Sequence, residues 1–414
     1  MTVSAPVNEG NVWYRGWLIV GIAAVAMVAT LPGRTVGLGM ITEAILVDLE
    51  MERTVYAQLN LVATLIGAAF GLLAGIAVDR AGLRLTTAGT LACLAASVIC
   101  MGMFAGAGTL GVFLVLSRGF GQSALSTCSM TMVGKWFNSH LSIALGVFTA
   151  LVSVGFVIAI SLAPLVTSLG WRTVWTYGGV ALLGLAALVW LLVPSRQQTP
   201  ALNTEAADNA GSSHDATLPQ ALRSPSFWIY TACTGTYYLT TTGLTLFYED
   251  VMKERGLDRD SYEVAMAAFL GAGLLGNFAA GFAARRFDLG RLLCLTMALL
   301  SVYLFTFPFI ESTSAAAAHA ALFGAAGGAF MVLFFTGYAK AFGKTHLGKI
   351  QGVAQTFMVI ASSFGPPLFA EIKAANESYA PVFSHLMPVF LALGVTAWFS
   401  SRWIKPRTPN QTAT

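Results

Sequence analysis

Residues 75–84 read GIAVDRAGLR, a short charged stretch enclosed by two long apolar segments. The segments cover residues 55–78 and 84–105, and each supplies the roughly 20 mostly apolar residues that a helix needs to cross a lipid bilayer. Gly75 permits a close approach between helices, and Gly82 permits a tight turn. The stretch therefore predicts a hairpin of two transmembrane helices joined by a charged loop.

A degenerate copy of this stretch lies in the second half of the chain. Residues 281–291 read GFAARRFDLGR, and the leading glycines of the two copies are 206 residues apart. A second pair has the same offset, HLSIALGV at 140–147 and HLGKIQGV at 346–353, with four of eight positions identical. Because both pairs fall between corresponding apolar segments, they indicate a duplication of the kind found in transporters.

Apolar segments of span length recur along the whole chain. Six precede a polar stretch at 195–224, which has almost no large apolar residues, and six follow it. The twelve segments lie at 16–47, 55–78, 84–105, 109–133, 141–166, 173–193, 226–248, 261–284, 290–310, 316–341, 347–371 and 380–404. The first is longer than one span and contains Pro32 and Gly33, so we expect it to bend or tilt.

These segments predict an all-α membrane protein with twelve transmembrane helices in two pseudo-symmetric six-helix bundles. The chain is 56% apolar and only 10% charged, whereas soluble domains carry about 25% charged residues. The predicted organisation is an N-terminal bundle at 1–194, a flexible cytoplasmic linker at 195–224 and a C-terminal bundle at 225–414.

The distribution of basic residues predicts the orientation. With the N-terminus inside, the inside segments hold fifteen Lys and Arg residues and the outside segments hold six. Such an asymmetry is the signal that sets membrane topology. We therefore expect a multi-pass protein of the inner (plasma) membrane with both termini in the cytoplasm.

Several other classes of protein lack their sequence signatures here. The five cysteines lie inside apolar runs without a CxxC pair, so we expect neither a metal site nor a disulfide framework. No HExxH, GxSxG or GxxxxGK[ST] motif occurs, which argues against an enzyme, and we expect no cofactor. The tails are short, so we do not expect the soluble domain of a sensor. We also expect no nucleic-acid partner, and a monomer suffices for this architecture.

The repeated charged stretch resembles the cytoplasmic loop signature of the major facilitator superfamily. The resemblance implies the twelve-helix fold and a loop that can latch the two halves in one conformational state. Gly170-Trp171-Arg172 before the sixth segment fits the same superfamily. Within the latch, Asp79 can accept hydrogen bonds from basic residues or cap a helix terminus. The residues expected in the latch are Gly75, Asp79, Arg80, Gly82, Arg84, Arg285, Arg286 and Arg291.

Within that superfamily, the chain looks most like the monocarboxylate transporters and the oxalate:formate antiporter group. The resemblance rests on PGRTVG at 32–37, MTMVGKWF at 130–137 and SPSFW at 224–228. It implies that Arg34 lies beside the substrate path. The chain departs from the group in the eighth segment, where Gly273 and Asn277 replace an acidic and a basic residue that carry a proton and bind carboxylate.

Ionisable groups inside membrane spans are expensive, and they mark functional sites by default. Arg34 and Arg118 are the only basic residues near the middle of their predicted spans, and no Asp or Glu lies clearly at mid-membrane. A guanidinium pairs well with a carboxylate, so the two cations favour an anionic solute. Other roles stay open, because Arg34 can pair with Glu43 or a helix carbonyl and Arg118 can be structural.

Polar side chains at helical spacing add further candidates for contact with a substrate. They are Gln122, Tyr237, Tyr238, Asn277 and Gln355. Such groups also serve as interhelical hydrogen bonds, and that role stays open for each of them. His319 and His385 begin the tenth and twelfth segments at the predicted outer side and are candidates for titration near neutral pH.

The sequence thus favours a secondary transporter that moves a small, monocarboxylate-like organic anion across the bilayer by alternating access. Proton coupling stays open, with Glu43 as the weak candidate for a carrier. The main alternative is an exporter or carrier of neutral or cationic small molecules. The alternative from a different functional class is a membrane-embedded enzyme or a transporter-like sensor.

Overall fold

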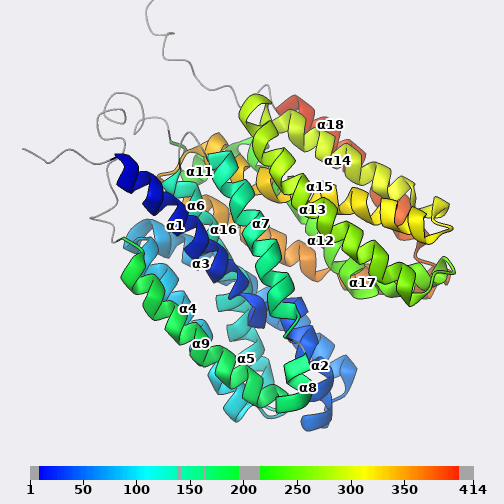
Figure 1. The fold of residues 1–414 in the computed structure, drawn as a ribbon, viewed down its shortest axis with the longest axis horizontal. Helices are drawn as coiled ribbons and strands as arrows, with labels where there is room; N and C mark the ends of the chain where they lie inside the picture. The colour runs from blue at the N-terminus through cyan, green and yellow to red at the C-terminus, as the bar shows by residue number, and fades with distance from the viewer. Residues whose placement is uncertain (1–8, 138–140, 163, 195–214, 401–414) are drawn as a thin grey trace, which may run out of the picture. The chain divides into compact units, whose positions relative to one another are not determined.

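The computed structural model describes residues 9–137, 141–162, 164–194 and 215–400, and the chain is drawn in Figure 1. Every regular element in these residues is a helix, and the helices coincide with the predicted apolar segments. The prediction of an all-α membrane fold is confirmed. Among the described residues, nine helical stretches are long and apolar enough to cross a membrane, and the shorter apolar helix Leu289–Phe305 adds a tenth.

Two predicted spans fall outside that set for identifiable reasons. The fourth is divided into α5 (Leu110–Ser117), a π-helix η2 (Arg118–Leu125) and α6 (Ser126–Trp136), so none of its pieces has full span length. The seventh is α12 (Pro225–Glu254), which contains many Thr and Tyr residues and ends in a charged turn. Polar groups therefore concentrate in these two helices.

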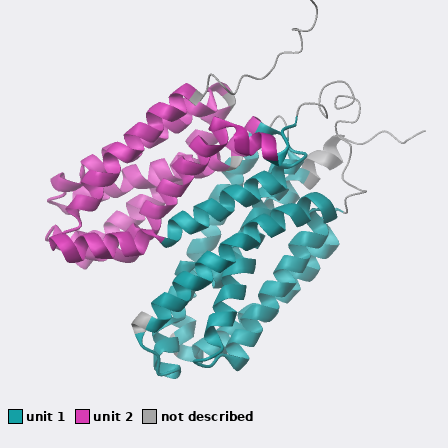
Figure 2. Cartoon of the chain, turned by 180° about the vertical axis from the view of Figure 1, so that it is seen from behind, with its two compact units in different colours: residues 1–218, 342–363 teal, residues 219–341, 364–414 magenta. Residues whose placement is uncertain are grey.

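The chain divides into two compact units (Figure 2). Unit 1 comprises residues 1–218 and 342–363, and unit 2 comprises residues 219–341 and 364–414. The helix α16, which begins the eleventh predicted span, belongs to unit 1 and packs against α3. Helix α16 covers Leu347–Ser363. Besides α16 and the three pieces of the fourth span, unit 1 contains α1 (Glu9–Val28), η1 (Leu31–Gly33), α2 (Thr35–Asp48), α3 (Arg53–Ala81), α4 (Leu83–Phe104), α7 (Leu141–Ile160), α8 (Pro164–Leu169) and α9 (Trp171–Leu192).

Unit 2 contains the other helices of the second half. They are α12, α13 (Arg259–Arg286), α14 (Leu289–Phe305), η3 (Phe307–Phe309), α15 (Thr313–Phe342), α17 (Gly365–Asn376) and α18 (Ala380–Ser400). The third and sixth spans of each half pack together, as α4 with α9 in unit 1 and α14 with α18 in unit 2. This correspondence agrees with the duplication inferred from the sequence.

The first span is broken where the bend was expected. Helix α1 ends at Val28, Pro32 and Gly33 form the single turn η1, and α2 resumes at Thr35. Gly33 is required for the packing of this break, because a Cβ there would lie 2.1 Å from the Ser117 carbonyl oxygen. The break therefore presses directly against the end of α5.

Gly33→Ala is expected to destabilise the folded protein by about 1–3 kcal/mol, since the methyl group meets backbone atoms that cannot rotate away. Gly39→Ala in α2 is the matched control, because a Cβ on Gly39 would meet no atom within 4 Å. Thermal unfolding of the purified variants in detergent checks the difference. Equal melting temperatures for the two variants would contradict this account of the break.

The predicted linker at 195–224 lies partly outside the described residues, and the predicted domain boundaries stay a prediction. Its described end contains a short helix, α11 (Leu218–Arg223), which the sequence did not predict. Asp215 precedes this helix and accepts hydrogen bonds from the Lys344 amide at 3.0 Å and from the Thr345 hydroxyl at 2.6 Å. The linker end is thus tied to the loop that precedes α16.

These contacts make stability depend on pH. Partial burial alone raises the pKa of the Asp215 carboxyl, but the hydrogen bonds from Thr345 and Lys344 outweigh it and hold that pKa below its usual value. A depressed folded-state pKa stabilises the fold above the unfolded pKa of about 3.9, and this contribution is lost as the pH falls through the folded value.

Asp215→Asn is therefore expected to lower the melting temperature near neutral pH, and its difference from wild type should shrink below about pH 4. Melting curves in detergent from neutral to acidic pH measure this. Asp260→Asn, an exposed carboxylate in the first turn of α13, is the control and should show no such convergence.

Candidate functional site

Arg118 is the most deeply buried cation of the site, with 5% of its surface exposed. Its guanidinium donates to Gln122 Oε1 at 2.7 Å, to Thr35 Oγ1 at 3.0 Å and to Asn60 Oδ1 at 3.0 Å. These acceptors come from η2, α2 and α3, and all of them are uncharged. Among the described residues, no carboxylate forms an ion pair with Arg118, and its Nε has no hydrogen-bond partner.

Arg34 lies at the break in the first span and joins the same polar region. Its Nε donates to Thr30 Oγ1 at 2.6 Å, and its Nη2 donates to Ser126 Oγ at 3.0 Å and approaches Met27 Sδ at 3.2 Å. The guanidinium carbon also lies 5.3 Å from the centroid of the Phe156 ring. These four contacts orient the Arg34 fork, and each of them is made to an uncharged group.

Both arginines belong to unit 1 and bond to residues of the same fourth span, Arg118 to Gln122 and Arg34 to Ser126. The described partners of Arg118 are neutral dipoles. In a low-dielectric interior, a cation held only by neutral groups is stabilised when an anion joins it. The arrangement can therefore receive a negatively charged group.

A π-helix positions Arg118, and it was not predicted from the sequence. Helices with this geometry occur as short stretches that are frequent at functional sites. Glycines allow close contact around it: a Cβ on Gly119 would lie 2.7 Å from the Phe70 ring, and one on Gly67 would lie 3.0 Å from Arg118 Cβ. Close packing of α3 against η2 thus fixes the base of the Arg118 side chain.

Helix α16 contributes two buried glutamines to the same region of unit 1. Gln355 Nε2 donates to the Gln122 carbonyl oxygen at 3.2 Å, and Gln351 Oε1 accepts from Thr131 Oγ1 at 2.9 Å. Gln355 Oε1 and Gln351 Nε2 are buried without a partner. The predicted residues Arg34, Arg118, Gln122 and Gln355 therefore form one polar cluster.

The other three predicted substrate residues lie in unit 2, close to α15. The Tyr237 ring stacks on Phe330 with 4.5 Å between centroids, and Tyr238 Oη lies 3.1 Å from Met331 Sδ. Asn277 is 2% exposed, and its Oδ1 has no hydrogen-bond partner. An unpaired buried amide oxygen is unusual and marks a place where a donor would be stabilising.

The eighth span, in which Gly273 and Asn277 replace an acidic and a basic residue, packs closely against the tenth. Helices α13 and α15 touch through small residues, since a Cβ on Gly328 would lie 2.1 Å from the Gly273 carbonyl oxygen and one on Gly276 would lie 2.2 Å from the Ala325 carbonyl oxygen. Small residues bring membrane helices into close backbone contact. A Cβ on Gly273 would itself lie 3.5 Å from the Gly324 carbonyl oxygen, which is an ordinary van der Waals contact.

Asp79 is the best-connected member of the predicted latch. Its carboxylate forms a 2.7 Å ion pair with Lys135 Nζ and accepts from the amides of Gly348 at 3.2 Å and Lys349 at 2.9 Å. The last two belong to the first turn of α16, so Asp79 also caps that helix. Gly75 supports the contact, since a Cβ on it would lie 2.1 Å from the Gly348 carbonyl oxygen.

The rest of the predicted latch is distributed over both units. Gly82 ends α3 with a φ of 89°, a value that glycine adopts readily. Arg84 and Arg291 each lie on an aromatic ring of their own unit. The side chain of Arg285 is outside the described residues, and Arg80 has partners of its own.

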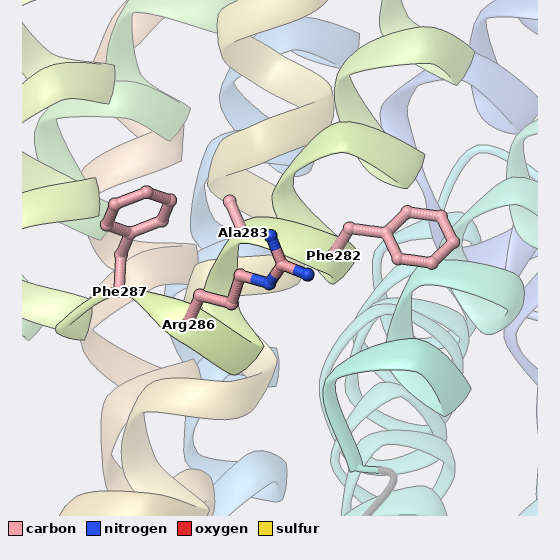
Figure 3. A pocket seen from close by; sticks show the side chains of 4 residues that line it. All are labelled: Phe282, Ala283, Arg286 and Phe287. Carbon is pink, nitrogen blue, oxygen red and sulfur yellow. The ribbon is translucent and has the colours of Figure 1, made fainter.

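Arg286 lines an open depression at the end of α13 together with Phe282, Ala283 and Phe287. Figure 3 shows the Arg286 guanidinium between the two phenylalanine side chains. Both phenylalanines are exposed. This open depression therefore differs from the buried polar cluster of unit 1.

Some partners of the site were not assigned to it in advance. Thr35 accepts a hydrogen bond from Arg118, and Ser126 accepts one from Arg34. Of these two acceptors, only Ser126 lies on the same predicted span as Arg118. His319 is 3% exposed and bonds through Nε2 to the Tyr303 carbonyl oxygen at 2.9 Å. His319 is therefore buried, whereas its position at the start of the tenth segment did not predict burial.

The fold and the cation cluster define a helical multi-pass membrane protein with a buried polar site. The family model of the Major Facilitator Superfamily matches residues 18–366 and 232–413, so this chain belongs to that superfamily. That superfamily consists of membrane transporters and not of enzymes. The narrower resemblance to the monocarboxylate and oxalate:formate group is not confirmed by the comparisons.

A curated relative agrees with the superfamily. An MFS-type efflux pump of Mycolicibacterium smegmatis (strain ATCC 700084 / mc(2)155) is 29% identical over 282 residues, which is 66% of this chain and 63% of that protein. The match thus spans less than two thirds of that relative.

Solved structures share the fold. The proton:xylose symporter XylE bound to 6-bromo-6-deoxy-D-glucose has a TM-score of 0.73 at 13% identity, covering 96% of this chain and 97% of its own. FucP in the outward conformation has a TM-score of 0.68 at 14% identity, covering 94% and 98%. A variant form of the E. coli fucose:proton symporter FucP has a TM-score of 0.67 at 14% identity, with the same coverage.

Proposed function

We propose that this transporter moves a small organic anion and that Arg34 and Arg118 bind its negative group. One observation carries the proposal: the buried Arg118 guanidinium is held by three neutral oxygens, and Arg34 bonds to Ser126 of the same span. A carboxylate offers two oxygens to such forks and offsets their charge. Closing a dry cavity around the two cations is unfavourable when no anion is bound to them. A bound anion removes this obstacle.

The neighbouring amides would complete the contact with the substrate. Gln355 Oε1 and Gln351 Nε2 are buried and unpaired, so they offer an acceptor and a donor in the same cluster. Tyr237, Tyr238 and Asn277 stay candidates for substrate contact in unit 2. We further propose that transport proceeds by alternating access in the inner membrane with both termini in the cytoplasm, by a monomer.

The test is uptake into proteoliposomes of a panel of labelled monocarboxylates, dicarboxylates, neutral sugars and organic cations, each with and without a pH gradient. The expected result is uptake of a carboxylate, and its dependence on the gradient decides whether a proton travels with it. Thermal-shift measurements with the same panel provide independent support, because a ligand that binds only the folded protein raises its stability. Uptake of sugars or cations alone would refute the anion assignment.

A second candidate is an exporter of neutral or cationic compounds. The name of the relative from Mycolicibacterium smegmatis, an efflux pump, favours it. An exporter of this kind has no need of the positive charge at Arg118. Substitution of Arg118 therefore separates the two candidates, because it should abolish transport of an anion and spare transport of a neutral compound.

We also propose that Asp79 holds α3 and α16 together as part of the latch. The ion pair with Lys135 and the two amide contacts with α16 support this role. The latch assignment of the other predicted members stays a hypothesis, and these are Gly75, Arg80, Gly82, Arg84, Arg285, Arg286 and Arg291.

A further inference from the structure

Each unit places an arginine on a tryptophan at corresponding positions of the repeat. The guanidinium carbon of Arg84 lies 4.4 Å from the Trp190 ring centroid, and that of Arg291 lies 5.5 Å from the Trp398 ring centroid. The arginines are in the first turns of α4 and α14, and the tryptophans are near the ends of α9 and α18. Both tryptophans are 45% exposed.

Within the described part of the protein, neither of these two side chains donates a hydrogen bond. A guanidinium carries five donors in a fixed fork that suits phosphate and carboxylate oxygens. An unfilled fork against an exposed tryptophan is therefore suited to an external oxyanion.

Other arginines stacked on aromatic rings differ in this respect. Arg172 lies 4.7 Å from the Trp171 ring but also pairs with Asp48 at 2.8 Å. Arg255 lies 5.7 Å from the Phe307 ring and donates to two backbone carbonyl oxygens. Both arginines belong to the face predicted to be outside, and their donors are engaged by the protein itself.

We propose that Arg84 and Trp190 bind the phosphate of an anionic phospholipid, and that Arg291 and Trp398 form a second, weaker site of the same kind. The charge distribution predicts that both pairs lie on the cytoplasmic face, where anionic lipids attract basic residues. Tryptophan favours this interface because its ring is apolar and its N–H is polar.

The helix termini explain why the two sites differ in strength. The first turn of α4 follows Gly82 and has no side-chain cap, so its amides add to the attraction for a phosphate. In α14, Asp288 accepts hydrogen bonds from the amides of Gly290 at 2.9 Å and Arg291 at 3.2 Å. This carboxylate occupies the amides and repels an anion, so it weakens the second site.

Native mass spectrometry of the full-length protein in detergent tests the proposal with phosphatidylglycerol and zwitterionic phosphatidylcholine as probes. Two phosphatidylglycerol molecules should bind in preference to phosphatidylcholine. Arg84→Gln should weaken the tighter step about tenfold, as expected for the loss of a charge-assisted contact. Arg291→Gln should weaken only the second step, and Asp288→Asn should strengthen it.

Arg255→Gln is the matched control, because its guanidinium is already satisfied by carbonyl oxygens. Trp190→Leu is a second variant that removes the platform and keeps the charge, and it should also weaken the tighter step. Wild-type binding of phosphatidylglycerol by Arg84→Gln or Trp190→Leu would overturn the proposal. Equal binding of the two lipids, or displacement of the lipid by inorganic phosphate, would overturn it as well.

Discussion

Arg118→Gln is expected to reduce uptake of the anionic substrate by about 100-fold, which corresponds to about 3 kcal/mol of lost charge-assisted hydrogen bonding. Glutamine keeps a polar side chain at 118 but has no charge to offset a carboxylate. The protein should still fold, because the present partners of Arg118 are neutral oxygens and no buried carboxylate is left unpaired. Uptake into proteoliposomes, normalised to the reconstituted protein, measures the effect.

Two further variants sharpen this prediction. Arg118→Lys keeps the charge but loses the planar fork, so its uptake should lie between those of wild type and Arg118→Gln. Arg34→Ala should also lose uptake while reaching the membrane. Wild-type uptake by Arg118→Gln would remove Arg118 from the substrate site. Aggregation of that variant in size-exclusion chromatography would instead assign Arg118 a structural role.

Asp79→Asn is expected to destabilise the contact between α3 and α16 by about 3 kcal/mol, a value typical of breaking a buried ion pair. The Asp79 side chain is 3% exposed and Lys135 is 22% exposed, so the substitution leaves the Lys135 ammonium with little water around it. It also removes the negative charge from the N-terminus of α16. Transport should fall because the latch opens more readily.

Cysteine accessibility reports on this contact directly. Gln351 is buried between α16 and α6, so Gln351→Cys in a variant without the five native cysteines should label slowly with a maleimide. Adding Asp79→Asn should increase the labelling rate, and it should also lower the melting temperature. An unchanged labelling rate would show that Asp79 does not hold α16 in place.

Control substitutions separate the ion pair from the helix cap. Lys135→Met should have a smaller effect than Asp79→Asn, because Asp79 then keeps both amide donors of α16. The double variant measures the coupling between the two side chains. Asp288→Ala removes a local cap of α14 only, and it should cost about 1 kcal/mol.

The helical character of the predicted spans follows from a simple constraint that lipid imposes. Every backbone polar group in a bilayer must be satisfied within the segment, so a run of about 20 apolar residues has to be a helix. The break at Pro32 and Gly33 also follows from local chemistry, because proline removes an amide donor. The importance of Arg34 and Arg118 followed from their charge alone.

The partners of those residues depended on contacts that periodicity does not encode. Ser126 follows Arg118 on the fourth span, but it accepts a hydrogen bond from Arg34 of the first span. The substitution of the family pair at Gly273 and Asn277 was visible in the sequence. The close packing of α13 against α15 beside these positions was visible only in the structure.

The sequence by itself determined the superfamily, the helices, the internal duplication and the two cations within the spans, since each depends on composition or on short local patterns. Only the tertiary structure decided that Arg118 is held by Thr35, Gln122 and Asn60, and that Asp79 caps α16. These contacts join residues far apart along the chain, and the packing of small side chains sets which of them meet. Pairwise contact of that kind has no periodic signature in a single sequence.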